Sequence, residues 1–477
     1  MMVQALAQVP RALGIPEIIK EILSYHAPQA TNGANAQRGD TETILACALC
    51  CKAFSEIALD SLWYEMVDLV PLISILPGIK LLDNNLFIDG ALHDDTCSRF
   101  WNYSRRIRRL IVPSRKSTER AIHVSVYSRL SLRFPGRAIL PFLECLDYTL
   151  TGKGDTAKYA IEFPILLSAS VRQLRVYNHA RERMCKALLS FLIDKAFQFQ
   201  HLTVEGPPPR YFVTHPLQLT SLRTLVLLRC QDTFPDLAHF FKQLPDLRNL
   251  TVQVTLEWVP SLTNKSIPTN LLPKLRFLSV EGPEEACLLL LQHISGEMLT
   301  SQRIVFNEIR MKRGRACLTE LSRFTSLRKI TLRYSSVEVT SVEALSILDP
   351  LLDFSHTQYL YLNSLPSWVR ITNDTIRGIA SGLKNLQTLH ISYKHYQGAF
   401  KTTSQALESI GLSSLNLREL TLPIDLADLT IWSIPRSSCT SSLVSLDLVT
   451  SSGDRALISQ FVEALFPKVE RLTIKSN

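Results

Sequence analysis

Three cysteines near the N-terminus, Cys47, Cys50 and Cys51, have a spacing that could serve half of a zinc site or a redox pair. A zinc site of this type needs a second pair of ligands, and the sequence contains no second CxxC segment. The three cysteines stand among alanine and leucine on a predicted helix, where cysteine behaves as a small apolar residue. We therefore predict no metal site. The ten cysteines of the chain are spread widely, which is typical of free thiols in a reducing compartment.

Other residues that could do chemistry lack the neighbours that the chemistry needs. His390 and His395 flank one short segment at the end of a predicted strand, which is more typical of packing than of a ligand pair. Segment 151–155, TGKGD, is a predicted turn, because no helix with Ser or Thr follows its lysine as in a phosphate-binding loop. The motifs GxSxG, HExxH, GxxxxGKS/T and GxGxxG are absent. We predict no enzyme, no catalytic residues and no cofactor.

The positive charge is concentrated in one segment, the basic strip from Cys97 to Arg137. The strip holds eleven Lys or Arg and one Glu, a balance of +10, so the rest of the chain sums to −1 against the total of +9. Its aromatic residues could stack on bases, as in a nucleic-acid surface: Phe100, Trp101, Tyr103, Tyr127 and Phe134. The alternatives are an acidic protein surface and a solvated strip without a specific role. We do not predict a nucleic-acid partner, and the role of the strip stays open.

The chain is organised around a six-residue pattern of three apolar positions, written LRNLTV at 247–252. The third apolar position recurs at intervals of 23 to 31 residues, which indicates stacked repeats. It falls at Tyr148, Val176, Val204, Leu227, Val252, Val280, Phe306, Leu332, Leu362, Ile391, Leu422, Leu448 and Ile474. In a strand the second and third apolar residues point to one face and the residue between them to the other. We therefore predict as core residues Leu225, Leu250, Leu278, Ile330, Leu389, Leu420 and Leu446.

These segments resemble leucine-rich repeats, as in LRTLVL (222–227), LRFLSV (275–280), LRKITL (327–332), LRELTL (417–422) and VERLTI (469–474). Segments with helical spacing lie between them, most clearly at 182–197, 284–295, 342–352 and 454–466. The pattern and the resemblance together predict an α/β fold over residues 141–477. This fold is a curved solenoid with a parallel sheet on the concave side and helices on the convex side.

Two sets of repeat residues are candidate contacts for a protein substrate. Tyr361 and His390 occupy the strand position that faces the concave side. The second position of the pattern is often arginine, and stacking in register would align these residues in a broken column: Arg172, Arg223, Arg248, Arg276, Arg328 and Arg418. Guanidinium groups bind carboxylates and phosphates in bidentate geometry. The alternative is that the arginine stems only cover neighbouring turns. The substrate, its degron and any dependence on phosphorylation stay open.

Three short amphipathic helices are predicted before the repeats, within residues 11–68. The first begins at Pro16, the second follows Thr43 and the third follows Ser55, while a mobile insertion is predicted at 26–42. Helices this short bury too small a fraction of their apolar surface to be stable alone. We therefore predict a partner or a docked neighbour for them.

The order of IPEII, EILSY and ILACALCCKAFSEIALDSLW is similar to the F-box, whose pattern begins with Leu-Pro, centres on a Val-Cys-Lys-x-Trp-like segment and ends in Trp. Ile15 replaces the leucine here, and many fungal F-box proteins have a similar apolar run after the final tryptophan. The resemblance implies docking onto the Skp adaptor of a cullin-based SCF ubiquitin ligase. The residues that it implies for this contact are Ile15, Pro16, Ile18, Ile19, Ile22, Leu23, Leu45, Leu49, Cys51, Lys52, Phe54 and Trp63.

The predicted organisation is an N-terminal tail at 1–10, the helices at 11–68, a connector with the basic strip at 69–140 that caps the array, and the solenoid. The sequence has no signal-peptide pattern and no apolar run near the ~20 residues of a membrane span, so we expect an intracellular protein of the cytoplasm or nucleus, without a membrane partner. The resemblance implies a substrate-recognition adaptor of a ubiquitin ligase. The alternative is a leucine-rich-repeat scaffold or inhibitor whose N-terminal helices only cap the solenoid. Exposed apolar residues on these helices would favour the adaptor.

Overall fold

The protein consists of two compact units, residues 1–212 with 217–219, and residues 213–216 with 220–477. The computed structural model describes residues 15–26, 38–113, 120–150, 162, 165–178, 198–206, 219–229, 237–263, 270–307, 314–335, 348–366, 369, 371–394, 402–427, 429–430, 439, 441–450 and 454–476. The predicted helix at 182–197, the turn at 151–155 and His395 lie outside these residues.

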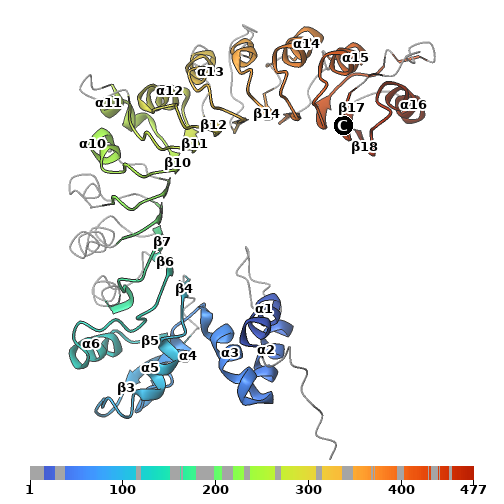
Figure 1. Cartoon of the computed structure of the whole chain (residues 1–477). Helices are drawn as coiled ribbons and strands as arrows, with labels where there is room; N and C mark the ends of the chain where they lie inside the picture. The colour runs from blue at the N-terminus through green and yellow to red at the C-terminus, as the bar shows by residue number, and fades with distance from the viewer. Residues whose placement is uncertain are drawn as a thin grey trace, which may run out of the picture. The chain divides into compact units, whose positions relative to one another are not determined.

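The first unit begins with three helices and continues into parallel strands (Figure 1). Its helices are α1 (Pro16–His26), α2 (Arg38–Cys50), α3 (Lys52–Tyr64), α4 (Val70–Ile73), α5 (Ser98–Ser104) and α6 (Val124–Arg133). Its parallel strands follow the order β1 (Glu65–Met66), β4 (Arg109–Val112), β6 (Cys145–Leu150), β7 (Gln173–Asn178) and β8 (His201–Glu205). A smaller sheet joins β2 (Ile79–Leu82), β3 (Asn85–Ile88) and β5 (Ala121–Ile122). Parallel strands thus extend into the connector predicted at 69–140.

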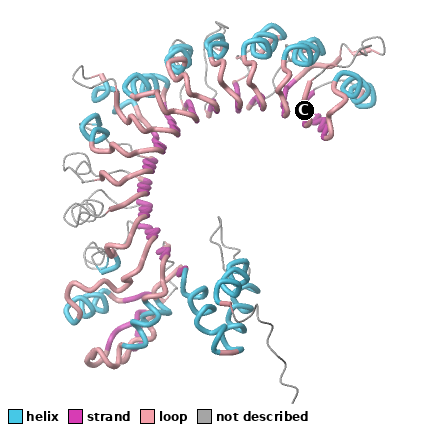
Figure 2. The backbone as a smooth tube through the Cα atoms, in the orientation of Figure 1, coloured by secondary structure: helices cyan, strands magenta, loops and turns pink. Residues whose placement is uncertain are grey.

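The second unit repeats a strand and a return segment (Figure 2). Its strands are β9 (Thr224–Leu228), β10 (Asn249–Gln253), β11 (Phe277–Gly282), β12 (Ser301–Phe306), β13 (Lys329–Tyr334), β14 (Tyr359–Leu365), β15 (Thr388–Tyr393), β16 (Glu419–Pro423), β17 (Ser445–Thr450) and β18 (Arg471–Ser476). Its helical segments are α10 (Leu237–Lys242), η2 (Leu256–Trp258), α11 (Val259–Leu262), α12 (Glu284–His293), α13 (Gly314–Leu321), η3 (Asp349–Asp353), α14 (Asn373–Gly382), α15 (Ser404–Ser413) and α16 (Arg455–Leu465). The strands line the concave side of this unit and the helices its convex side (Figure 1).

The core of the second unit lies between the strands and the helices. All seven predicted core residues are at most 2% exposed, which confirms the alternation along the strands. Neighbouring strands pair in register, so Leu250 lies between Leu225 and Leu278 in one continuous apolar row. This arrangement is the leucine-rich-repeat-like parallel solenoid that the periodicity predicts.

One repeat has a different register from the predicted one. Ile304 of β12 pairs with Val280 and Leu332, so it occupies the position that the sequence pattern assigned to Phe306. Val305, expected on the concave face, is buried, and Arg303 pairs there with Ser279 and Thr331 instead. The run IVF is apolar at three successive positions, so alternation alone could not select the register.

Some helix boundaries also differ from the predictions. Helix α2 begins at Arg38, so Thr43 lies inside the helix and does not cap it. Helix α3 begins at Lys52 after Cys51, three residues before the predicted cap at Ser55. The predicted helix at 454–466 is confirmed as α16, which begins after Asp454, whose side chain accepts a hydrogen bond from the Ala456 amide at 2.9 Å. At 342–352, the described part is the 3-10 helix η3 around Pro350.

Candidate protein-interaction surfaces

The three N-terminal helices have an apolar core of their own. Ile19, Leu23, Ile44 and Ala58 are buried together, and Phe54 packs partly against them. Ile19 and Leu23 are each 1% exposed, so they hold the helices together and cannot contact a partner directly. The prediction of a partner contact at these two residues is therefore wrong, because one stripe of α1 is needed for the bundle itself.

A second stripe of apolar residues on α1 points away from this core. Ile15, Ile18, Ile22 and Tyr25 follow one another at steps of three and four residues, which places them on one helix face. All four are exposed, from 38% for Ile18 to 78% for Tyr25. Tyr25 was not among the predicted contacts, although its spacing from Ile22 and Ile18 was visible in the sequence.

Helix α2 is divided in the same way. Ile44 is buried in the bundle, whereas Leu45 and Leu49, four residues apart, are 49% and 80% exposed. We call these two residues, with the exposed stripe of α1, the apolar helix surface. Pro16, Cys51 and Lys52 are also exposed, as a partner contact requires. Exposed apolar residues at helical spacing on two helices are typical of an interaction site.

Trp63 contacts a later segment of the chain, whereas the F-box resemblance assigned it to the adaptor contact. Its ring packs on Tyr103 of α5, with 4.7 Å between the ring centroids, and is half-buried. The backbone amide of Arg108 donates to the carbonyl of Tyr64 at 3.0 Å. Trp63 thus connects α3 to the segment that follows the helices, and its part in a partner contact stays a prediction.

Arginines of the basic strip form ion pairs with other segments of the first unit. The guanidinium of Arg106 forms ion pairs with Glu56 and Asp60 of α3. Arg109 forms ion pairs with Glu65 at 3.2 Å and Asp147 at 3.1 Å, which link β1, β4 and β6. Carboxylates far apart in the sequence therefore neutralise the charges of Arg106 and Arg109.

Other residues of the strip support the fold nearby. Arg129 and Arg133 donate to the backbone carbonyls of Ile88, Gly90 and Leu92. Arg137 lies 3.6 Å above the ring of Trp101. The aromatic residues of the strip are buried, apart from Tyr103, which stacks on Trp63: Phe100, Trp101, Tyr127 and Phe134. Buried rings cannot stack on bases, so the strip lacks the platform that a nucleic-acid surface needs.

In the second unit, the positions of the predicted arginine column are joined by a ladder of backbone hydrogen bonds between successive repeats. The amide of Arg248 donates to the carbonyl of Arg223, and the amide of Arg276 to that of Arg248, each at 2.8 Å. The ladder then passes through Thr300, Arg328, Gln358, Gln387 and Arg418. All five arginines are exposed, but three uncharged residues interrupt the column. The pKa of Asp246 is lowered, first by the hydrogen bond and charge of Lys274 and then by the charges of Arg248 and Arg223. These two arginines therefore already lie near a carboxylate.

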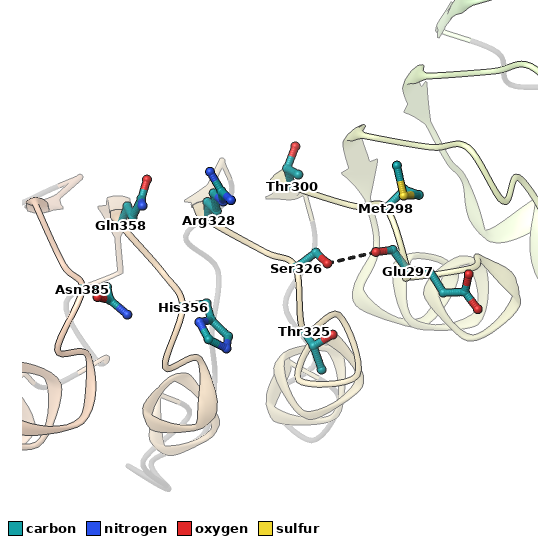
Figure 3. Close-up of a pocket in the computed structure, with 9 residues that line it drawn as sticks. All are labelled: Glu297, Met298, Thr300, Thr325, Ser326, Arg328, His356, Gln358 and Asn385. Atoms are coloured by element: carbon teal, nitrogen blue, oxygen red, sulfur yellow. Dashed lines mark hydrogen bonds between the residues drawn. The ribbon is translucent and has the colours of Figure 1, made fainter.

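A groove of about 530 Å³ lies at this rim beside Arg328 (Figure 3). Most of its lining residues are of polar type: Glu297, Met298, Thr300, Thr325, Ser326, Arg328, His356, Gln358 and Asn385. Ser326 Oγ donates to the backbone carbonyl of Glu297 at 2.9 Å. The groove combines one arginine with one glutamate, so it is suited to a polar peptide more than to a phosphate group.

Tyr361 and His390 lie apart from the column, on the concave face. They pair in register on β14 and β15, with 6.1 Å between ring centroids, and Lys329 Nζ lies 5.4 Å from the Tyr361 centroid. Burial lowers the pKa of His390, opposed by the charge of Asp447. The predicted substrate contacts therefore form two separate places, the rim and the concave face.

The described residues contain neither a candidate metal cluster nor a helix that could span a membrane. In this part of the chain, no group of three or more His, Cys, Asp or Glu could hold a metal ion. Cys47 is half-buried on α2, whereas Cys50 and Cys51 are exposed. No helix in the described ranges is long and apolar enough to cross a bilayer.

Comparison with known proteins gives distant likenesses among solved structures alone. No protein-family description matches the chain, and no curated protein matches it. Among solved structures, it is similar to the crystal structure of the leucine-rich repeat-containing protein LegL7 from Legionella pneumophila. The two are 13% identical, with a TM-score of 0.34, over 73% of this chain and 95% of that one.

Proposed function

We propose that this protein is a non-catalytic substrate-recognition adaptor of an SCF ubiquitin ligase in the cytoplasm or nucleus. In this proposal the apolar helix surface binds the Skp adaptor and the repeats bind a protein substrate. The observation that carries the proposal is the division of α1 and α2 into a buried stripe and an exposed one. The resemblance of residues 11–68 to the F-box supports the choice of partner.

The mechanism requires no chemistry from the adaptor itself. A substrate held by the repeats and a ligase core held by the helices are connected by one chain. This connection raises the effective concentration of the substrate lysines near the conjugating enzyme.

A specific observation favours the alternative, a leucine-rich-repeat scaffold or inhibitor. Trp63 and Arg106 fix α3 to the segment that follows it, as expected of helices that cap an array. A cap, however, does not account for exposed Ile18, Leu45 and Leu49 on the remaining faces. We therefore place the adaptor first.

Binding of the purified chain to a Skp adaptor, measured by calorimetry, tests the proposal. Changing Ile15 and Pro16 together to Ala should weaken binding by ~30-fold or more, since central interface residues contribute about 2 kcal/mol or more and 1.4 kcal/mol is tenfold. The matched control is Leu412→Ala on α15, where the leucine is 77% exposed in the second unit. This control should leave binding unchanged. If the unmodified protein fails to bind at micromolar concentration, the scaffold alternative replaces the ligase role.

A further inference from the structure

The concave face of the second unit carries several rows of side chains, and the residue types change in order along it. One row pairs Arg303, Thr331, Tyr361, His390, Thr421 and Asp447 on successive strands. The adjacent row pairs Ser301, Lys329, Tyr359, Thr388 and Glu419. Both rows point away from the buried apolar rows, because alternate residues of a strand face opposite sides.

The strands β12 and β13 form the basic end of this face. Arg303, Lys329 and Arg333 are all exposed there. Among the described residues, no carboxylate lies within ion-pair distance of any of these three. In this they differ from Arg106 and Arg109 of the strip, whose charges are paired, and they are the candidate basic contacts for a partner.

The strands β14 and β15 form an aromatic centre. Tyr361 is half-buried between Lys329 on one side and His390 on the other. Tyr359 lies beside it and donates to the side chain of Gln387 at 3.3 Å. Partly exposed rings fixed by their neighbours supply contact area at little cost in conformational entropy.

The strands β16 and β17 carry the acidic end. Glu419 is exposed and accepts a hydrogen bond from Thr388 at 3.2 Å, and Asp447 is half-buried one strand further on. Beyond them, Arg471 and Lys475 of β18 are basic again. The acidic end is therefore a narrow band, and any group that it attracts must be placed over β16 and β17.

We infer that this face binds an extended peptide segment that crosses the strands, with an acidic residue over Arg303 and Arg333, a large apolar residue against Tyr361, and a basic residue over Glu419. This inference names the substrate class of the adaptor proposed above and rests on that proposal. Charge complementarity of this order fixes the direction of the peptide as well as its position. The acidic end also disfavours a polyanion such as RNA.

The strand spacing sets the separation of the two charges in the peptide. Three strand steps separate β13, which carries Arg333, from β16, which carries Glu419. At ~4.8 Å a step these make about 14 Å, which an extended chain spans in about four residues. The acidic and basic residues of the peptide should accordingly stand about three to five positions apart.

Selection of a phage-displayed random dodecapeptide library on the immobilised full-length protein tests this inference. Enriched peptides should share an acidic and a basic residue at that spacing with a large apolar residue between them. A synthetic copy of one enriched peptide, measured by fluorescence anisotropy, should bind Tyr361→Ala and Arg303→Glu at least about tenfold more weakly, the equivalent of 1.4 kcal/mol. Arg377→Glu, on helix α14 of the same unit, is the matched control and should bind normally. Circular dichroism of each variant verifies its fold.

A charge exchange provides the second arm. The triple variant Arg303→Glu, Arg333→Glu and Glu419→Lys should prefer a peptide in which the acidic and basic residues are interchanged. The inference is overturned by a library without enrichment, by enriched peptides without this charge order, or by equal affinity for Tyr361→Ala. Binding to the Skp adaptor is measured on the same protein samples. If the protein fails to bind the adaptor but still selects such peptides, the ligase role is excluded and the peptide-binding face is retained.

Discussion

The buried amide of Gln302 gives the sharpest test of the repeat register. Gln302 lies on β12 between Leu278 and Ile330, in the row that is otherwise apolar. Its side chain is 1% exposed, and among the described residues neither amide atom has a hydrogen-bond partner. A buried polar group without a partner costs about 1 to 3 kcal/mol. Gln302→Leu removes this cost and adds apolar burial of similar shape, so the free energy of unfolding should rise by about 1 to 3 kcal/mol.

Urea denaturation followed by circular dichroism measures the change. The reverse substitution one strand away, Leu278→Gln, is the matched control and should lower the free energy of unfolding by about 2 kcal/mol or more, because it removes apolar burial and buries an amide. If Gln302→Leu instead destabilises the protein by more than about 1 kcal/mol, the amide has partners in the folded state. The register assigned to β12 would then be refuted.

Three further predictions concern the core, the strip and the thiols. Leu250→Ala should lower the free energy of unfolding by ~2 to 5 kcal/mol through lost burial and a cavity, and an unchanged urea midpoint would contradict the repeat core. Arg106→Ala should destabilise the first unit by about 1 kcal/mol, because its carboxylate partners are largely exposed, whereas Arg105→Ala should be neutral by thermal denaturation. Burial, and then the charge of Asp147, raises the pKa of Cys145 to about 12, so iodoacetamide at pH 8 should modify Cys145 at least about tenfold more slowly than exposed Cys50 by mass spectrometry.

The repeat architecture was predictable because it depends on local periodicity. Leu250 and Val252 alternate with Thr251, and the same alternation returns at nearly constant intervals, so the sequence predicted both the strand and the buried face. The prediction failed at β12, where successive apolar residues satisfy two registers equally well. Pairing with β11 and β13 selected Ile304 there.

The candidate surfaces were only partly predictable. The sequence placed apolar residues on both sides of α1, but packing against Ile44 and Ala58 decided that Ile19 and Leu23 are buried while Ile18 and Ile22 are exposed. Only one of the two concave rows was predicted from the sequence, the row of the residue between the inward positions. The second row was missed, although residues two places apart along a strand share a face.

By itself the sequence determined the repeat, its core residues and the presence of amphipathic helices, since each of these depends on spacing along the chain. Only the tertiary structure decided which charges are free. Arg106 and Arg109 meet acidic groups from distant segments, whereas Arg303 and Arg333 meet none among the described residues. A charge is neutralised by whatever lies within a few ångströms in space, and composition contains no information on such neighbours.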